Sequence, residues 1–343
     1  MGSLVAKFGP DGAQQWLHDL PDGARGEAVA VNASGDAYFV GWMVSTNTSW
    51  LEKRDVFGNQ VWRVELISPE NSLRAYGVAV SPNGKVVVTG GVWFGPGDGV
   101  AFLATYSALG AEESFRLQPF PFDGEWESQG RDVAVDALGN VYVAGHANRS
   151  AAADGRLNYA YVAKYDASGG AVWIDRFTGG GRTDRASGVA ANASADRVCA
   201  TGWVIGELEG QSRIGVFGDA YVVCYDTSGT RLYTRQFGTE EEDYGEGIAL
   251  DAAGNVYVVG STDGTFGTDL GGLLGGGTDA FLARYDSQGN QTHIWQFGTP
   301  QGDFANGVAV DGSGNVYVTG RTFGRMYTVG PVPGAFLVKV EGF

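Results

Sequence analysis

The sequence predicts an all-β fold in which a four-stranded unit is repeated along the chain. Two kinds of hairpin alternate through the 343 residues, and successive copies of the first kind are separated by 49 to 60 positions. Both kinds consist of two runs in which apolar and polar residues alternate around a turn. No segment carries apolar residues at helical spacing over several turns. We therefore expect strands along the whole chain, without a helical layer.

The first kind of hairpin is represented by VAVDGSGNVYVTG at 308–320 and occurs six times. We name its strands a and b. Strand a is short and apolar with a small residue at its middle, which suits a position where little volume is available. The turn residues are Gly35, Gly84, Gly139, Ala195, Gly254 and Gly314, and the small residues are Ala30, Ala79, Ala134, Ala190, Ala249 and Ala309.

The second kind of hairpin follows the first in five repeats, and we name its strands c and d. The copies are WLEKRDVFGNQVW at 50–62, FLATYSALGAEES at 102–114, YVAKYDASGGAVW at 161–173, YVVCYDTSGTRLY at 221–233 and FLARYDSQGNQTH at 281–293. A leading copy, LVAKFGPDGAQQW, occupies 4–16, and a trailing AFLVKV at 335–340 matches strand c alone. Bulky residues mark strand d, since Trp16, Trp62 and Trp173 share one register while Trp295 falls two positions later.

Repeated four-stranded units of this length predict a β-propeller, in which twisted sheets pack radially and bury their faces against neighbouring blades. The segments GVAVD, GNVYVTG, AFLARYD and W-Q-F-G resemble the bacterial β-propeller repeats known as seven-bladed or SBBP repeats, and more distantly NHL repeats. The resemblance implies the propeller fold. It implies no particular function, because propellers include enzymes, lectins and docking scaffolds.

We expect a single domain over 1–343, with repeats at about 4–20 (partial), 26–66, 76–118, 130–177, 186–237, 245–297 and 306–343 (partial). The simplest closure joins the C-terminal a, b and c strands to the N-terminal d strand near 13–20, which completes a sixth blade and removes the open sheet edges. Both 4–8 and 335–340 fit the c position, so one c-like strand is left over. The alternative is a seven-bladed or incomplete ring.

The charge of the chain limits its partners. The sequence has 23 Lys and Arg against 39 Asp and Glu, a net charge of −16, and contains no basic run. Nucleic acid and anionic membranes are therefore not expected partners. The sequence also contains no apolar stretch long enough to span a membrane and no apolar core of a secretion signal. We expect a monomeric bacterial protein that is extracellular, periplasmic or attached to the cell surface, with its signal absent from this sequence.

The candidate binding surface is formed by the long b–c and d–a connections, which emerge on one face of a propeller. The position after the b-strand glycine varies among the repeats, being Trp42, Gly91, His146, Trp203, Ser261 and Arg321. Aromatic side chains there can stack on sugar rings or anchor a peptide. The candidate ligand-binding residues are Trp42, Trp93, Trp126, His146, Trp203 and Arg321, toward a protein or polysaccharide ligand. The alternative is that each Trp packs beneath its own loop.

The function predicted first is a non-catalytic binding or scaffold propeller without a cofactor. Asp311, Ser313 and Asn315 have the spacing that opens a calcium loop, but other repeats exchange the last two, which favours an Asx turn. Acidic d–a connections suggest the alternative, a calcium-dependent hydrolase or lyase whose axial ion is held by Asp243 and Asp303. No nucleophile elbow, zinc-type His pair or phosphate-binding loop supports an enzyme.

The two cysteines belong to adjacent strands of one repeat, with Cys199 in strand b and Cys224 in strand c. A disulfide between them would indicate an oxidising compartment, whereas two buried thiols would not. The sequence leaves both possibilities open.

Overall fold

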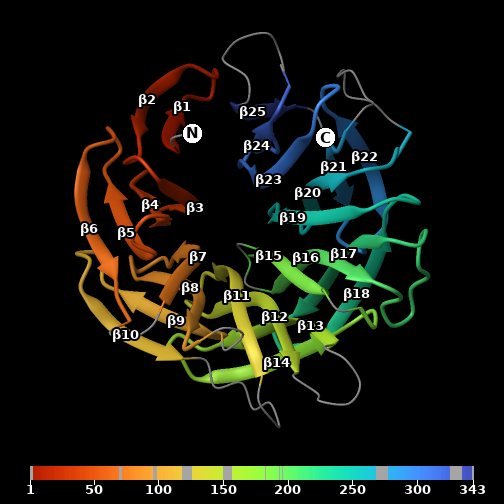
Figure 1. Ribbon diagram of the computed structural model, residues 1–343, viewed down its shortest axis with the longest axis horizontal. Coiled ribbons are helices and arrows are strands. Elements are labelled where there is room, and N and C mark those ends of the chain that lie inside the picture. Colours follow the sequence, from red (N-terminus) through yellow and green to blue (C-terminus); the bar gives the residue numbers. More distant parts are fainter. Residues whose placement is uncertain are drawn as a thin grey trace.

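The computed structural model is a ring of antiparallel β-sheets around a central axis, as Figure 1 shows. It describes residues 3–68, 72–95, 99–117, 126–149, 157–181, 183–192, 194, 196–267, 277–324 and 334–341. These residues contain strands, turns and loops but no helix, and therefore none that could cross a membrane. The predicted all-β propeller with six blades is confirmed.

The blades follow one another around the ring in chain order. Blade 1 contains β3 (Ala24–Val31), β4 (Ala37–Met43), β5 (Thr48–Arg54) and β6 (Gln60–Leu66); blade 2 contains β7 (Ser72–Val80), β8 (Val86–Trp93), β9 (Gly99–Tyr106) and β10 (Glu112–Leu117); blade 3 contains β11 (Trp126–Val135), β12 (Val141–Arg149), β13 (Leu157–Tyr165) and β14 (Ala171–Phe177). Blade 4 contains β15 (Arg185–Ala191), β16 (Arg197–Ile205), β17 (Gly218–Asp226) and β18 (Arg231–Phe237); blade 5 contains β19 (Asp243–Leu250), β20 (Val256–Thr262), β21 (Asp279–Tyr285) and β22 (Gln291–Phe297); blade 6 contains β23 (Asp303–Val310), β24 (Val316–Thr322) and β25 (Gly334–Val340). In blades 1 to 5 the strands pair in the predicted order a, b, c, d, and in blade 6 the described strands pair in the order a, b, c.

The pairing at the termini differs from the expected closure. Strand β1 (Leu4–Phe8) pairs with β2 (Gln14–Asp19) in a separate two-stranded sheet, and β25 pairs with β24 in a three-stranded one. The turn between β1 and β2 is closed locally, because the Gly9 N–H donates to the Ala13 carbonyl at 2.8 Å. Because this turn pairs β2 with β1, β2 does not pair with β25 as expected. Both c-like segments of the sequence are therefore true strands, each in its own sheet.

The a–b turns are the Asx turns that the sequence predicts. Asp311 Oδ1 accepts hydrogen bonds from the N–H groups of Ser313 and Asn315, both at 2.9 Å, while Oδ2 accepts from Asn315 Nδ2 and the Tyr317 hydroxyl. These bonds, the one from the Asn315 side chain above all, lower the pKa of Asp311 to about 2. Gly314 follows with φ of 84°, which only glycine adopts without strain. Both carboxylate oxygens are used by the turn, so this segment belongs to the scaffold.

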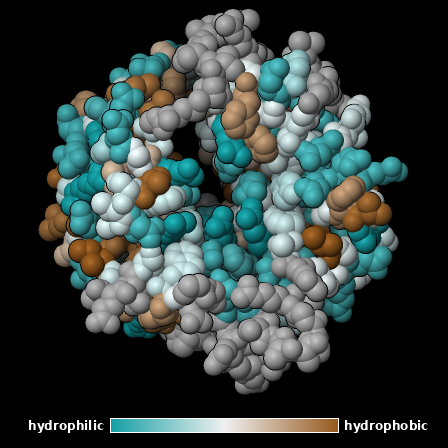
Figure 2. All heavy atoms as spheres, in the orientation of Figure 1, coloured by the Kyte–Doolittle hydropathy of each residue, from teal (hydrophilic) through white to brown (hydrophobic). Residues whose placement is uncertain are grey.

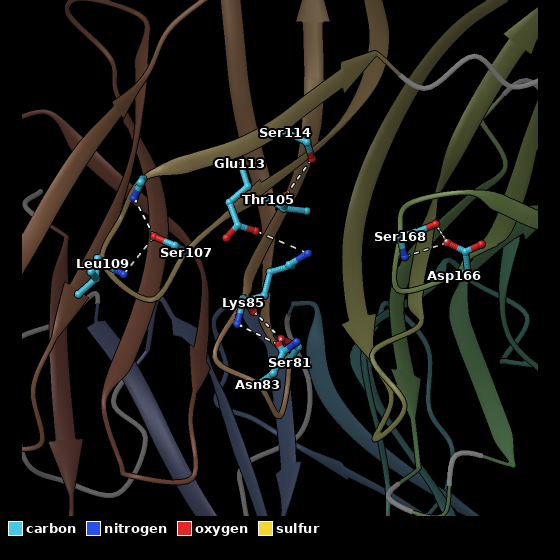
Figure 3. A network of polar contacts seen from close by, with 11 residues as sticks. Ser81, Asn83, Lys85, Thr105, Ser107, Leu109, Glu113, Ser114, Asp166 and Ser168 are labelled. Carbon is cyan, nitrogen blue, oxygen red and sulfur yellow. Dashed lines mark hydrogen bonds and ion pairs between the residues drawn. The ribbon is translucent and has the colours of Figure 1, made fainter.

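The c–d turns use the same device, with Asp or Ser as the side-chain acceptor. Figure 3 shows Ser107 Oγ accepting from the backbone N–H of Leu109, and Asp166 Oδ1 accepting from that of Ser168 one blade further on. In the same view Lys85, which belongs to the a–b turn of blade 2, contacts Glu113 of strand β10 at 3.5 Å. Short side-chain acceptors therefore replace one another at a fixed place, which explains why the turn sequence varies while its shape does not.

The b-strand glycine has a different purpose from the turn glycine. A Cβ atom at Gly202 would collide with the carbonyl oxygen of Arg185 on strand a and would lie 2.8 Å from the Tyr221 hydroxyl on strand c. The equivalent residues Gly41, Gly90, Gly145, Gly260 and Gly320 meet the same strand-a carbonyl. Each repeat therefore keeps glycine here because strands a and b approach too closely for any side chain.

The core consists of apolar layers between consecutive blades. Between blades 3 and 4, for example, Tyr142 and Val162 pack with Val198 and Tyr221. Successive residues of a strand face opposite neighbours, so Cys199 belongs to the layer between blades 4 and 5. There it lies directly opposite Cys224 and forms a disulfide with it, and neither residue is exposed. The described residues contain no free cysteine.

Candidate binding site at the axial face

The variable position after the b-strand glycine lies opposite a second variable position on strand a. Trp42 pairs with Arg25, His146 with Gln129 and Trp203 with Arg185. Directly opposed residues of an antiparallel pair project from the same side of the sheet. These pairs stand where strand a begins and strand b ends, at the face from which the d–a and b–c connections emerge. The full set of strand-a residues at this position is Arg25, Arg74, Gln129, Arg185, Tyr244 and Phe304.

Arginine and tryptophan side chains stack between blades 1 and 2. The Arg74 guanidinium lies 4.1 Å from the centre of the Trp42 ring and 5.8 Å from that of Trp93. Arg25 approaches the Trp42 ring at 5.6 Å, and Trp42 Nε1 donates a 2.7 Å hydrogen bond to Glu27 Oε1. The Arg74 Nε and Nη2 groups both donate to Asn47 Oδ1 at 3.2 Å, which fixes the guanidinium against the aromatic faces. Trp42 and Trp93 are half-buried. Each ring is therefore partly accessible to a ligand and is not fully covered by its own loop.

A second arginine–aromatic group joins blades 4 and 5. Arg185 lies 5.6 Å from the Trp203 ring centre, and its Nη2 contacts Glu246 Oε1 at 2.9 Å. The Trp203 ring meets Tyr244 edge-on at 5.1 Å. Trp203 is therefore held from both sides by residues of strand a.

Blade 3 connects the two groups through Arg131 and His146. The Arg131 guanidinium lies 4.5 Å from the Tyr76 ring of blade 2. Burial, with the nearby charges of Arg131 and Arg185, lowers the pKa of His146 to about 3, so its ring is neutral at physiological pH. Burial also lowers the pKa of Arg131, which remains charged, while Arg185 repels it and Glu246 and Glu27 stabilise its charge.

Four arginines from four consecutive blades are thus gathered near the axis of an acidic protein. We name Arg25, Arg74, Arg131 and Arg185 the axial arginine cluster. Its acidic neighbours are Glu27 and Glu246, and desolvation by the surrounding protein raises the pKa of the Glu27 carboxyl. Figure 2 shows hydrophilic residues around the hollow at the centre of the ring. The cluster is arranged to receive an anionic group together with an apolar ring face.

The remaining predicted ligand-binding residues lie elsewhere or outside the described part. Arg321 is exposed on blade 6, where its guanidinium stacks on Phe304 at 4.4 Å and lies 5.7 Å from the Phe323 ring centre. Trp126 begins strand β11, but its side chain lies outside the described residues. The structure thus brings Trp42, Trp93, His146 and Trp203 to the arginine cluster and places Arg321 on another blade.

The strand-a arginines are the functional candidates that sequence reasoning missed. The repeat alignment contained a signal for them, since the residue before the a-strand Gly or Ala varies as much as the residue after the b-strand glycine. A bulge at the next step, such as that between Gly26 and Ala28, shifts the register and hides the pairing from a simple count.

The two predicted metal ligands are buried in separate interfaces between blades. Asp243 Oδ2 accepts from Thr239 N at 2.6 Å and from Thr239 Oγ1 at 3.1 Å, and Asp303 repeats this arrangement with Thr299. Asp243 approaches Gly238 together with Asp219 of the preceding blade. Burial raises the pKa of Asp243 to about 6. No group of three or more His, Cys, Asp or Glu with metal-binding geometry occurs among the described residues.

Comparison with known proteins adds the family. The model of the family described as Beta-propeller repeat matches residues 232–267 and 294–324, which run from strand d through a and b in two successive repeats. Two of the repeats of this chain are therefore similar to the Beta-propeller repeat family. A curated relative, the regulatory protein FlaEY of Caulobacter vibrioides, is 29% identical over 209 residues, which are 53% of this chain and 21% of that protein. The chain thus spans about a fifth of the length of this relative.

Solved structures agree with the β-propeller repeat fold. A protein of unknown function from Dyadobacter fermentans has a TM-score of 0.55 at 9% identity, covering 93% of this chain and 94% of that one. The GH93 α-L-arabinofuranosidase of Fusarium graminearum has a TM-score of 0.54 at 11% identity, with 93% and 95% covered, and the α-L-arabinanase of Penicillium chrysogenum one of 0.51 at 12%, with 87% and 89% covered. At these identities the likeness concerns the fold alone.

Proposed function

We propose that this β-propeller is a non-catalytic binding module that takes an acidic polysaccharide at the axial arginine cluster. The observation that carries the proposal is the stacking of the Arg74 guanidinium on Trp42, which presents a planar cation beside aromatic faces. A uronic acid carries a carboxylate, which pairs with guanidinium groups, and a ring face, which stacks on Trp. Binding of an acidic segment of a protein is the alternative, because its carboxylates would meet the same donors.

The balance of charge supports an anionic ligand. Four arginines face two carboxylates in the cluster, Glu27 and Glu246, so the mouth of the axis is locally positive on a chain whose net charge is −16. Local charge within about 10 Å governs a bound ligand at physiological salt, because more distant charges are screened. The remaining acidity would keep nucleic acid away. The buried disulfide supports a location in an oxidising compartment, which agrees with a secreted or surface-attached role.

The test is binding to matched acidic and neutral polysaccharides on an array, at low and at physiological salt. We expect binding to the acidic set only, and Arg74→Ala to weaken it about tenfold or more, since a hydrogen bond to a charged group contributes about 1.5–3 kcal/mol. Trp42→Ala should weaken it as well. The matched control is Arg116→Ala, which removes an arginine that donates to the Gly169 carbonyl away from the cluster. Equal effects of Arg74→Ala and Arg116→Ala, or a preference for neutral glycans, would reject the proposal.

A calcium-dependent hydrolase or lyase is the second candidate. It is favoured by the buried carboxyl groups of Asp219 and Asp243, which approach the same glycine from neighbouring blades. Calcium accepts such oxygen ligands, although it prefers six to eight of them. An ion there would lie between two blades, so it would support the scaffold before it supported any reaction. Metal analysis of the purified protein, with Asp243→Asn as the comparison, tests this candidate.

A further inference from the structure

The outward face of blade 6 is built like a blade interface but is not covered by one. In blade 5 the residues that face the next blade are fully buried, with Val259 and Leu282 both at 0% exposure. The residues in the same registers of blade 6 are Thr319, which is exposed, and Leu337, which is 40% exposed. Blade 6 also ends at strand β25, which has no described strand on its outer side. Among the described residues its sheet therefore has neither a d strand nor a neighbouring sheet on this face.

The β1–β2 hairpin has the complementary defect. One of its sides packs on blade 1, where Val5 contacts the layer containing Phe39 and Trp50. On its other side Leu4 is 48% exposed and Phe8 is 40% exposed, whereas the same registers of blade 5 hold Phe281 and Tyr285 at 0% and 1%. The hairpin thus has the strands c and d of a blade without its strands a and b.

The innermost strand of blade 1 shows which strands would cover this region. In blade 4, Val189 is 4% exposed because Ala134 and Tyr142, from strands a and b of the preceding blade, pack against it. The equivalent residue of blade 1, Val29, is 63% exposed, and Val31 is 62% exposed. Strand β3 is therefore an inner strand without an a–b hairpin on its preceding side. Figure 1 shows the corresponding sector of the ring between the β1–β2 hairpin and the β23–β25 sheet.

The uncovered surfaces together specify three strands: a d strand for blade 6, followed by strands a and b for the β1–β2 hairpin. Consecutive d, a and b strands form a continuous unit everywhere else in the chain, for example β18, β19 and β20 over 231–262. Each of the two segments that match the family model also contains a d–a–b unit. The sector therefore requires three strands in the order d, a, b, and it offers the unpaired edges of β25 and β1 to the first and last of them.

We propose that the sector between β25 and β1 is a docking site for one further d–a–b repeat unit, joined to β25 through a tight c–d turn. Its d strand would pair with β25 and its b strand with β1, which satisfies both exposed sheet edges. Its apolar side chains would cover Leu337 on one side and Val29, Val31, Leu4 and Phe8 on the other. The occupied ring would contain seven four-stranded blades. The proposal is independent of the ligand at the axial face.

The experiment fuses a second copy of residues 231–262 to the full chain after Glu341 and measures the accessibility of a single cysteine. Val29→Cys supplies the probe, because the described residues hold no free cysteine and Cys199 and Cys224 are bonded to each other. We expect the fusion to slow maleimide labelling at Val29→Cys tenfold or more and to raise the melting temperature by roughly 10 °C. Leu138→Cys, at a turn residue that is 73% exposed, is the control whose labelling should not change.

A matched fusion carries lysine in place of the copied Val258 and Val259, which cannot enter the apolar layers, and it should leave Val29→Cys reactive and the melting temperature unchanged. The proposal is overturned if the intact fusion labels Val29→Cys as fast as the unfused chain does. It is equally overturned if the unfused chain sediments as a dimer in which Val29→Cys is already protected, since a second copy would then occupy the sector.

Discussion

Asp243 allows a stability prediction in which the charge of one side chain is separated from its hydrogen bonds. The carboxyl is fully buried and accepts two bonds from Thr239, and burial raises its pKa from 3.8 to about 6. A folded state that raises the pKa of an acid binds more protons than the unfolded state between the two pKa values. Stability therefore falls as pH rises from about 4 to about 6, and the loss is complete above that range.

The magnitude follows from the same two pKa values. Each pH unit between them corresponds to about 1.4 kcal/mol, so ionising Asp243 costs the folded state about 3 kcal/mol at neutral pH. Asp243→Asn keeps an oxygen that can accept from Thr239 but cannot ionise. We expect the variant to match the wild type near pH 4 and to be more stable than it by up to about 3 kcal/mol at pH 8.

Urea unfolding followed by tryptophan fluorescence, from pH 4 to pH 8, gives both free energies. The difference between wild type and variant isolates this one group, because every other carboxyl is present in both. Asp243→Ala is the control for the hydrogen bonds, since it removes the acceptor and should destabilise at every pH. A difference between wild type and Asp243→Asn that does not change with pH would show that folding leaves the pKa of Asp243 at its unfolded value, and would refute the desolvation argument.

Three further predictions concern the scaffold. Replacing Cys199 and Cys224 with alanine should lower the free energy of unfolding by roughly 3 kcal/mol, the loop-closure value for a separation of 25 residues, and an unchanged urea midpoint would contradict it. Gly202→Ala should destabilise by about 3 kcal/mol, because its Cβ meets a backbone carbonyl, while Gly314→Ala at a turn with open space should cost only about 1 kcal/mol; calorimetry showing equal effects would contradict this ranking. Because the described residues give Asp219 and Asp243 no third acidic ligand, we expect a chelator to lower the melting temperature by less than about 2 °C, and a larger fall would favour the calcium candidate.

The repeat could be predicted from the sequence because each hairpin is determined by residues that are close together in the chain. An Asx residue, a turn glycine and alternating apolar residues fix each hairpin without reference to the rest of the chain. The b-strand glycine was visible in the same alignment, but its cause was not, since the collision at Gly202 involves a strand-a carbonyl 17 positions earlier. The local hairpin patterns therefore predicted the blades, whereas the close approach of strands a and b could be seen only in the structure.

The candidate site was only half predictable for a related reason. Trp42 and Trp203 attracted attention because they vary among repeats that otherwise agree, and the structure places both at the face where the connections emerge. Their arginine neighbours come from strand a of the same blade or of the next one, so no spacing along the chain connects Arg74 with Trp42. The closure at the termini differed because the short turn after β1 makes a local hairpin, which costs less loop entropy than pairing with strands more than 300 residues away.

The contrast between constant and variable positions has one physical origin. A side chain in the middle of a strand faces the apolar layer of the adjacent blade, where a change of volume leaves a cavity or a clash, and Val198 and Tyr221 are examples of this constraint. A side chain at the start of strand a or the end of strand b lies beyond that layer, and its neighbours are the residues at the same level of the next blade. Arg74 against Trp42 and Arg185 against Glu246 are such contacts. These positions are free to exchange one polar or aromatic residue for another without loss of the fold, so a ligand site can form there on a scaffold whose stability does not depend on it.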